Sequence, residues 1–562
     1  MAELAPRPEA QARSASRPEA QTDSAQREQA SGPAGRDGAW RYALPGWLVA
    51  AIPALVAFLI TGVGLSGPSL WRDEAYTKDA ISRSLSHLFA LLGHTDAVHG
   101  AYYVMMHFVS EVIGTSDAAL RFPSLFAMAV ATGFTAAIGR RAAVLAGARW
   151  PGATGLLSGM LFAVAPYMTY YGQMARSYAF VTMFATIASY LLLRAAAPGG
   201  APRGSASGGW RWWAGYGVAV AFTGLFNTFG LLIIPAHALT VLWASPSPTR
   251  GGMARWARRV AVPWLAGSLA AVAVLLPVLL ISFRQRGQIS WLAKPNINTI
   301  TTMLREYAGS KALIVPVALL AVGGVMAALF DGQGTGGRRL SPAAIGLPWL
   351  VVPPVILLAV SLVKPVYSQR YIEFCLPALA ILVAAGLVGL ARLVATTSLG
   401  RRDVRVAWAP SAVIAAVLAV MLISPQHAIR QSSARPDDLR LASAIVAANE
   451  QPGDVVFYMP DDMYVLGTGY PAPFSRLRNI GIAESPVASA TLTGREVTSP
   501  AGLAARFTDV KRVWFVTGNS NYKFPTPTSP VDKEMMALVS ASGLHLTHRW
   551  QAGEVMLSLY SR

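Results

Sequence analysis

The chain has 562 residues, of which 53% are hydrophobic and 13% are charged, and its formal net charge is +19. Soluble domains carry about a quarter charged residues, so this composition excludes an ordinary soluble protein and predicts a polytopic membrane protein. The positive charge does not indicate nucleic-acid binding. The arginines recur in short loops between apolar segments, for example Arg140-Arg141 and Arg401-Arg402, as the positive-inside rule expects of cytoplasmic loops. The single cysteine, Cys375, excludes an internal disulfide.

The first 42 residues are polar and rich in Ala, Gln, Arg, Glu, Ser and Pro, and Arg-Pro-Glu-Ala-Gln occurs at 7–11 and again at 17–21. This composition cannot bury a core, which predicts a disordered tail over 1–42. A first membrane helix at roughly 46–66 follows without a cleavable signal peptide, after Arg36 and Arg41. We therefore expect a cytoplasmic N-terminus in the plasma membrane.

Further apolar segments predict that a transmembrane domain fills 43–425. They lie at roughly 97–114, 118–138, 150–170, 174–194, 213–226, 228–245, 260–282, 311–330, 343–363, 371–395 and 406–424. The first of them contains His99, His107 and Glu111, so we interpret it as an interfacial or re-entrant helix. The expected fold is a polytopic α-helical membrane protein with roughly 11 to 13 crossings and a first outer loop at 67–96.

The chain changes character after about residue 424. A helical pattern at 437–449 precedes apolar runs at 455–458, 513–516 and 555–560, which are typical of strands. This alternation predicts a small α/β domain over 426–562. If the basic loops are cytoplasmic, the alternation of sides along the chain places this domain outside the cytoplasm. Within it, the pair Asp461-Asp462 and the run Gly467 to Gly469 fit either substrate contacts or ordinary turns.

Charged and aromatic residues gather in the predicted outer loops. The first cluster is Trp-Arg-Asp-Glu-Ala-Tyr-Thr at 71–77, just beyond the first apolar segment. Its carboxylates, Asp73 and Glu74, fit either a functional site at the membrane surface or the first turn of an amphipathic connector. Further along, His99 and Tyr103 have the i, i+4 spacing of one helical face.

Two more clusters carry arginine. Arg176 stands among aromatic residues in a tight outer turn, where it fits either a bound phosphate or lipid snorkelling. Lys364 and Arg370 bracket another short outer loop that also contains Tyr371. That loop is suited either to an anionic ligand or to an interfacial anchor.

Metal binding is a weaker alternative for the first outer region. Glu74, His94, Asp96 and His99 include ligand types for a divalent cation, but no ligand pair with a recognised metal spacing is present. We therefore assign no cofactor from the sequence and keep a divalent cation as an alternative.

Five motifs in order resemble polyprenyl-phosphate-dependent glycosyltransferases of the GT-C superfamily, such as protein O-mannosyltransferases, lipid A aminoarabinose transferases and actinobacterial envelope relatives. The motifs are Trp-Arg-Asp-Glu-Ala at 71–75, the stretch from 96 to 107, Leu-Arg-Phe-Pro-Ser at 120–124, Gln-Met-Ala-Arg-Ser-Tyr at 173–178, and Gln-Arg-Tyr at 369–371 with Leu-Pro-Ala at 376–378. They cover about residues 45–395. Two departures are Val98-His99-Gly100 in place of His-Pro-Pro, and Met174 in place of Glu.

The resemblance implies a membrane enzyme that moves a hexose or pentose, with mannose or arabinose foremost, from a polyprenyl phosphate to an extracytoplasmic envelope acceptor. The acceptor is a lipoglycan, a polysaccharide or a protein, and the displacement is inverting. The partners are then the lipid-linked sugar, the acceptor and the bilayer. A transporter or flippase of a lipid-linked anion is the alternative, but its ionisable groups should lie near the membrane midplane.

The resemblance also suggests roles for individual residues. A carboxylate takes the acceptor proton, for which Asp73 is expected, with Glu74 in support. Arginine binds phosphate oxygens through its planar fork. The residues expected to bind the lipid phosphate are Arg176, Arg370 and Lys364. Those expected to bind substrate are Arg72, His99, Tyr103, Tyr178 and Tyr371.

Overall fold

The computed structural model describes residues 44–197, 209–246, 249–331, 340–518, 527 and 529–562. The predicted disordered tail at 1–42 lies outside these residues. The chain divides into a unit of residues 1–45 and a unit of residues 46–562, and the fold described below belongs to the second unit.

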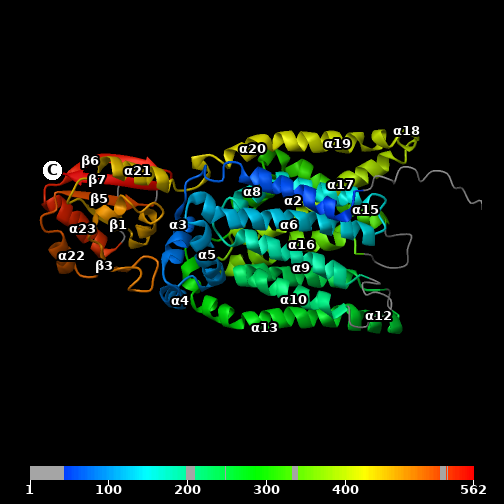
Figure 1. The fold of residues 1–562 in the computed structure, drawn as a ribbon, viewed down its shortest axis with the longest axis horizontal. Coiled ribbons are helices and arrows are strands. Elements are labelled where there is room, and N and C mark those ends of the chain that lie inside the picture. Colours follow the sequence, from blue (N-terminus) through cyan, green and yellow to red (C-terminus); the bar gives the residue numbers. More distant parts are fainter. Residues whose placement is uncertain (1–43, 198–208, 247–248, 332–339, 519–526, 528) are drawn as a thin grey trace, which may run out of the picture. The chain divides into compact units, whose positions relative to one another are not determined.

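Long apolar helices form most of that unit (Figure 1). They and the short helices between them are α2 (Gly46–Gly62), α6 (Asp117–Leu145), α7 (Pro151–Val164), α8 (Pro166–Gly172), α9 (Tyr178–Ala195), α10 (Gly209–Phe226), α11 (Ile233–Trp243), α12 (Arg250–Trp256), α13 (Val262–Arg284), α14 (Ile297–Ala308), α15 (Ile314–Asp331), α16 (Pro342–Val363), α17 (Leu376–Val394), α18 (Ser398–Arg402), α19 (Val404–Met421) and α20 (Ile423–Ala428).

Seven helical stretches in the described residues are long and apolar enough to cross a bilayer. The chain is therefore a multi-pass membrane protein, and the predicted polytopic helical fold is confirmed. Apolar helices such as α2 and α7 are shorter than 18 residues. The predicted count of 11 to 13 crossings requires such helices to cross as well, so it stays a prediction.

The helices differ in how much of their surface other helices cover. In the most apolar window of the span that contains α17, 78% of the residues are buried, against 17% for the span that contains α15. α15 therefore leaves most of its apolar surface to lipid. The two helices approach closely at Gly324 and Gly386, where an added Cβ would lie 2.1 and 2.0 Å from backbone oxygens of the opposite helix. Glycine is required there because any side chain would separate the backbones.

Three shorter helices follow the first apolar helix: α3 (Arg72–Ser82), α4 (Leu85–His94) and α5 (Gly100–Ile113). Figure 1 shows them beside one end of the long helices. α5 has 14 residues, about 21 Å at 1.5 Å per residue. A crossing needs about 20 residues, so this length agrees with an interfacial helix.

The C-terminal part has the predicted α/β fold. Its strands are β1 (Val455–Met459), β2 (Arg478–Asn479), β3 (Ile482–Glu484), β4 (Arg495–Glu496), β5 (Arg512–Thr517), β6 (His545–Ala552) and β7 (Val555–Ser561). Five of them form a sheet in the order β2-β1-β5-β7-β6, with β2, β1 and β5 parallel. β7 is antiparallel to both β5 and β6.

Helices cover both faces of this sheet. α21 (Leu439–Asn449) packs on the face to which Val456 and Tyr458 belong. α22 (Pro500–Arg506) and α23 (Pro530–Ala541) pack on the other face, with Phe457. The alternation of buried side chains along β1 therefore supplies two hydrophobic cores, as expected for a strand buried on both faces.

Ion pairs join the C-terminal part to the start of α3 and to the start of α6. The guanidinium of Arg72 donates to both oxygens of Asp437 at 2.9 and 3.0 Å, and its backbone N–H donates to the same carboxylate. Arg440 donates to Asp117 at 2.6 Å. Asp437 therefore ties the start of α3 to the start of α21, in addition to standing near a helix N-terminus.

The Asp437→Asn substitution tests this attachment. It removes the charge of a fully buried carboxylate, and we expect a loss of about 2 kcal/mol of stability because charge-assisted hydrogen bonds contribute about that much. Limited proteolysis should then release a C-terminal fragment more readily. The control is Glu450→Gln, whose partner Arg476 is largely exposed, because exposed pairs contribute little. Equal proteolysis of the two variants would contradict the attachment.

Candidate active site

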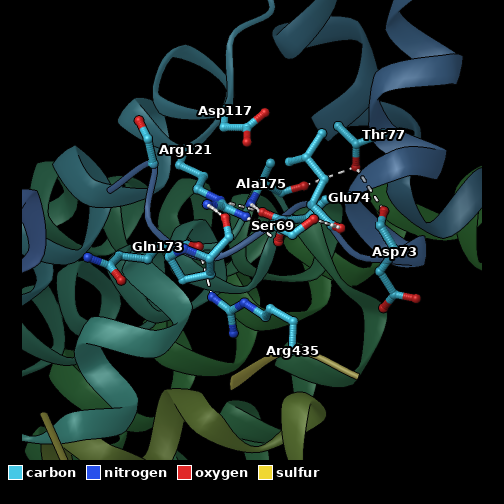
Figure 2. A network of polar contacts seen from close by, with 12 residues as sticks. Ser69, Asp73, Glu74, Thr77, Asp117, Arg121, Gln173, Ala175 and Arg435 are labelled. Atoms are coloured by element: carbon cyan, nitrogen blue, oxygen red, sulfur yellow. Dashed lines mark hydrogen bonds and ion pairs between the residues drawn. The ribbon is translucent and has the colours of Figure 1, made fainter. Parts of the chain in front are cut away.

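The site is built on the first turn of α3, where Asp73 and Glu74 favour the positive end of the helix dipole. Neighbouring residues on a helix point about 100° apart. In Figure 2 the side chain of Glu74 accordingly points toward Arg121, whereas the carboxylate of Asp73 points away from it. The two adjacent carboxylates therefore have separate surroundings.

Glu74 and Arg121 form a buried ion pair. The Nε and Nη2 atoms of Arg121 donate to the two carboxylate oxygens at 2.8 and 2.7 Å, and both side chains are fully buried. The remaining donors of Arg121 bond to backbone oxygens of Leu65, Pro68 and Ser69. Glu74 also accepts the backbone N–H of Ala175 at 2.8 Å. This network joins the start of α3 to α6 and to the turn that carries Arg176.

Asp73 faces two arginines from other parts of the chain. Its carboxylate is paired with Nη1 of Arg370, and its side chain keeps 14% of its surface accessible. Its backbone oxygen accepts from Nη1 of Arg176 at 3.2 Å. The structure thus brings together three residues that lie far apart in the sequence.

Arg176 is held by a ring of polar partners in the interior. Its Nη1 donates to the Tyr103 hydroxyl at 3.0 Å, and its Nη2 donates to Nε2 of His99 at 2.8 Å. Within the described residues, the buried Nε atoms of Arg176 and Arg370 have no hydrogen-bond partner. A buried N–H without an acceptor costs free energy. Both guanidinium groups can therefore gain from an acceptor atom of a ligand.

Asp96 belongs to this cluster, although its proposed role in the sequence was only that of an optional metal ligand. It adopts a left-handed backbone conformation with φ of 57°, and it accepts the Tyr103 hydroxyl proton at 2.6 Å. Burial raises the pKa of its carboxyl group, and Arg176 partly offsets this effect. The seven-residue spacing between Asp96 and Tyr103, about two helical turns, could have indicated this contact in the sequence.

His99 has a defined tautomer in this arrangement. Since arginine only donates, Nε2 of His99 accepts from Arg176 and the ring proton lies on Nδ1, which faces the hydroxyl of Ser177 at 3.3 Å. Burial, followed by the charges of Arg176 and Arg370, holds the pKa of His99 well below its usual value. The imidazole is therefore neutral at neutral pH.

Aromatic rings line the cluster. Tyr178 meets the ring of His99 edge-on with centroids 6.5 Å apart. Tyr371 stacks on Phe229 at 4.6 Å, and the guanidinium of Arg370 lies 5.4 Å from the ring of Trp291. The sequence analysis did not identify Trp291, because the loop that contains it has no motif around this residue.

Three predicted site residues lie outside the cluster. Arg72 is engaged by Asp437 because its position on α3 directs it to the C-terminal part. Lys364 is the exposed residue after α16, and among the described residues it has no bond to the cluster. Both oxygens of Glu74 are occupied by Arg121. Arg72 and Glu74 are therefore engaged by protein partners, while Lys364 lies apart from the cluster and its predicted role stays a prediction.

The four proposed metal ligands do not form one group in the described residues. Glu74 pairs with Arg121, and His94 bonds the backbone oxygen of Ala90 in its own helix. The described ranges contain no group of three or more metal-ligating side chains. The divalent cation therefore gains no support from these four residues.

The Glu74→Gln substitution should destabilise the fold strongly. Removing one charge of a buried pair leaves Arg121 uncompensated, which costs about 3 to 5 kcal/mol. Thermal unfolding in detergent measures the effect. Glu111→Gln is the control, because Glu111 is mostly exposed and pairs with His107. A Glu74→Gln protein as stable as the Glu111→Gln protein would contradict the structural role.

The neutral state of His99 predicts a pH dependence of stability. Below a pH of about 6.5 the unfolded state binds a proton that the folded state does not, so stability decreases as the pH falls. The wild type should lose more thermal stability between about pH 7 and pH 5 than the His99→Gln variant. His87→Gln, at an exposed site, is the control. Parallel loss in the wild type and His99→Gln would exclude a neutral buried His99.

The chain matches no known family profile and no curated protein sequence. Solved structures do resemble it. ArnT from Cupriavidus metallidurans in the apo state has a TM-score of 0.55 at 13% identity, covering 92% of this chain and 98% of its own. The same protein bound to undecaprenyl phosphate has a TM-score of 0.54 at 14% identity, with the same coverage.

A third similar structure is the mycobacterial arabinofuranosyltransferase AftD. Its TM-score is 0.45 at 15% identity, over 92% of this chain and 42% of AftD, which is too low to bear on the fold. The ArnT likeness extends over nearly the full length of both proteins. The chain therefore has the fold of ArnT, with helical membrane and C-terminal α/β parts.

Proposed function

We propose that this protein is an integral-membrane glycosyltransferase that moves a sugar from a polyprenyl phosphate to an extracytoplasmic acceptor. The observation that carries this proposal is the placement of Asp73 between Arg176 and Arg370. Each arginine keeps a buried Nε–H without a partner in the described residues. The ArnT fold, whose solved structures include one with undecaprenyl phosphate, is compatible with such a ligand.

The cluster supplies the two functions that glycosyl transfer requires. Asp73 removes the proton of an acceptor hydroxyl, and the acceptor oxygen forms a bond to the anomeric carbon of the sugar. The bond from that carbon to the phosphate oxygen breaks, and the electron pair leaves with the polyprenyl phosphate. Arg176 and Arg370 stabilise the phosphate charge. A single displacement of this kind inverts the anomeric configuration.

Arg370 links donor binding to the availability of the base. In the ligand-free arrangement its Nη1 is paired with Asp73. A phosphate provides two oxygens for the guanidinium fork and competes with that carboxylate. Binding of the donor therefore frees Asp73 to accept a proton, so the base is active when the donor is in place.

The other residues support this centre. His99 and Tyr103 position Arg176, and Asp96 positions Tyr103. Tyr178 and Tyr371 enclose the arginines and are proposed to contact the donor. Glu74 is a positioning residue that fixes the start of α3, which revises its expected part in catalysis.

We propose mannose or arabinose as the transferred sugar and a lipoglycan, polysaccharide or protein of the cell envelope as the acceptor. The N-terminus is assigned to the cytoplasm, and the cluster and the C-terminal part to the outside of the plasma membrane. The ionisable cluster lies at the ends of the helices, at the short turn between α8 and α9 and the loop before α17. This placement favours a transferase over a transporter with a midplane site.

Transfer of labelled mannose and arabinofuranose from undecaprenyl and decaprenyl phosphates into envelope fractions tests the function. The wild type should incorporate label, and Asp73→Asn should lose about 10²- to 10⁴-fold of the rate because a general base contributes that much. Asp509→Asn is the matched control, because Asp509 is exposed and its positive φ suits asparagine.

Incorporation by Asp73→Asn at the rate of the Asp509→Asn protein would exclude Asp73 as the base. No incorporation from any donor by the folded wild type would contradict the transferase and favour transport of a lipid-linked anion.

A further inference from the structure

A cavity of about 390 Å³ lies between α3 and the C-terminal sheet. Lys78, Asp79 and Ser82 of α3 line one side. The opposite side includes Val456 and Tyr458 of β1, Asn479 of β2, and residues of the segment that joins these strands.

Asn479 lines this cavity and carries an unused donor. Its Oδ1 accepts the backbone N–H groups of Gly481 at 3.0 Å and Ile482 at 3.2 Å, which fixes the orientation of the amide. Its Nδ2 is buried and has no hydrogen-bond partner in the residues that the structure describes. A ligand oxygen in the cavity would satisfy this donor.

Other lining groups offer both acceptors and donors. Asp79 is paired with Arg83 at 2.7 Å, and burial raises the pKa of its carboxyl group, so a further donor would stabilise the carboxylate. The hydroxyls of Ser82 and Thr468 lie along the same walls. Lys78 already donates to the backbone oxygen of Gly469 at 2.8 Å, so an anionic ligand is not required to satisfy this donor.

Aromatic rings complete the lining. Tyr464 and Phe474 are part of the wall, and Tyr458 meets Tyr464 at 5.4 Å between centroids. Apolar ring surface combined with a carboxylate, an amide and hydroxyls suits a neutral ligand with many hydroxyl groups and apolar C–H faces. Carbohydrate has this chemistry.

The cavity shares α3 with the candidate active site. Asp79 is six residues beyond Asp73 on that helix, about 9 Å along its axis and 120° around it. A group in the cavity is therefore too far from Asp73 to react, but it can belong to the same acceptor.

We propose that this cavity binds a neutral sugar unit of the acceptor, one or more units away from the hydroxyl that is glycosylated. This inference rests on the proposed glycosyltransferase function. The proposal favours a substrate contact for the run Gly467 to Gly469, because Gly467 and Thr468 line the cavity. It also assigns acceptor recognition to the contact between α3 and the C-terminal sheet.

Two variants of the full-length protein in nanodiscs test the proposal. Ser82→Trp places a large ring at an exposed lining position. Asn479→Asp keeps the oxygen that orders the turn and removes the free donor. The control is Lys533→Trp, an exposed position on α23, which covers the other face of the sheet.

The readouts are saturation-transfer NMR with mannan and arabinan oligosaccharides of two to four units, and KM for acceptor and donor in the transfer assay. Binding of an oligosaccharide should fall at least tenfold in Ser82→Trp and Asn479→Asp but remain in Lys533→Trp. The acceptor KM should rise by a similar factor, with kcat and the donor KM unchanged.

Direct binding separates the two proposals. If the wild type transfers no sugar but binds an oligosaccharide that Ser82→Trp excludes, the cavity is supported and the proposed reaction is not. If the wild type transfers sugar and both variants retain the acceptor KM, the cavity is not an acceptor site. Absence of oligosaccharide binding by the wild type also overturns the cavity proposal.

Discussion

The buried ion pair between Glu74 and Arg121 is the interaction on which the candidate site depends. It joins the start of α3 to α6, and through the Ala175 N–H it also fixes the turn that carries Arg176. A fully buried pair requires that nearly every polar atom be satisfied, and here backbone oxygens of the 65–69 loop complete the coordination of Arg121. The position of Asp73 relative to Arg176 follows from this single junction.

The neighbouring residues Asp73 and Glu74 point in different directions from one turn of α3 and therefore have different roles. Glu74 points into the protein and is neutralised by Arg121, while Asp73 remains partly accessible and faces Arg370. The two arginines of the cluster come from distant turns, and each keeps an unpaired Nε–H in the described residues. Together these features give a carboxylate and two cations that a phosphate can rearrange, which is the basis of the proposed transfer reaction.

Much of the fold could be predicted from the sequence. Hydropathy identified the long helices, and short apolar runs identified β1, β5 and β7. The motif order brought Asp73, Arg176 and Arg370 into one hypothesis, and their proximity agrees with it. The sequence could not separate Glu74 from Asp73, because the direction of each side chain depends on how α3 packs. Nor could it place Arg72 on Asp437 or identify Trp291, since these contacts join segments without a shared motif.

The central claim is that Arg370 exchanges the Asp73 carboxylate for the lipid phosphate. The most direct test is the affinity of the wild type and the Asp73→Asn variant for undecaprenyl phosphate in nanodiscs, measured at one ionic strength. The exchange predicts tighter binding by Asp73→Asn, because the phosphate no longer competes with a carboxylate for Arg370, together with the loss of transfer. Equal or weaker binding by Asp73→Asn would contradict it.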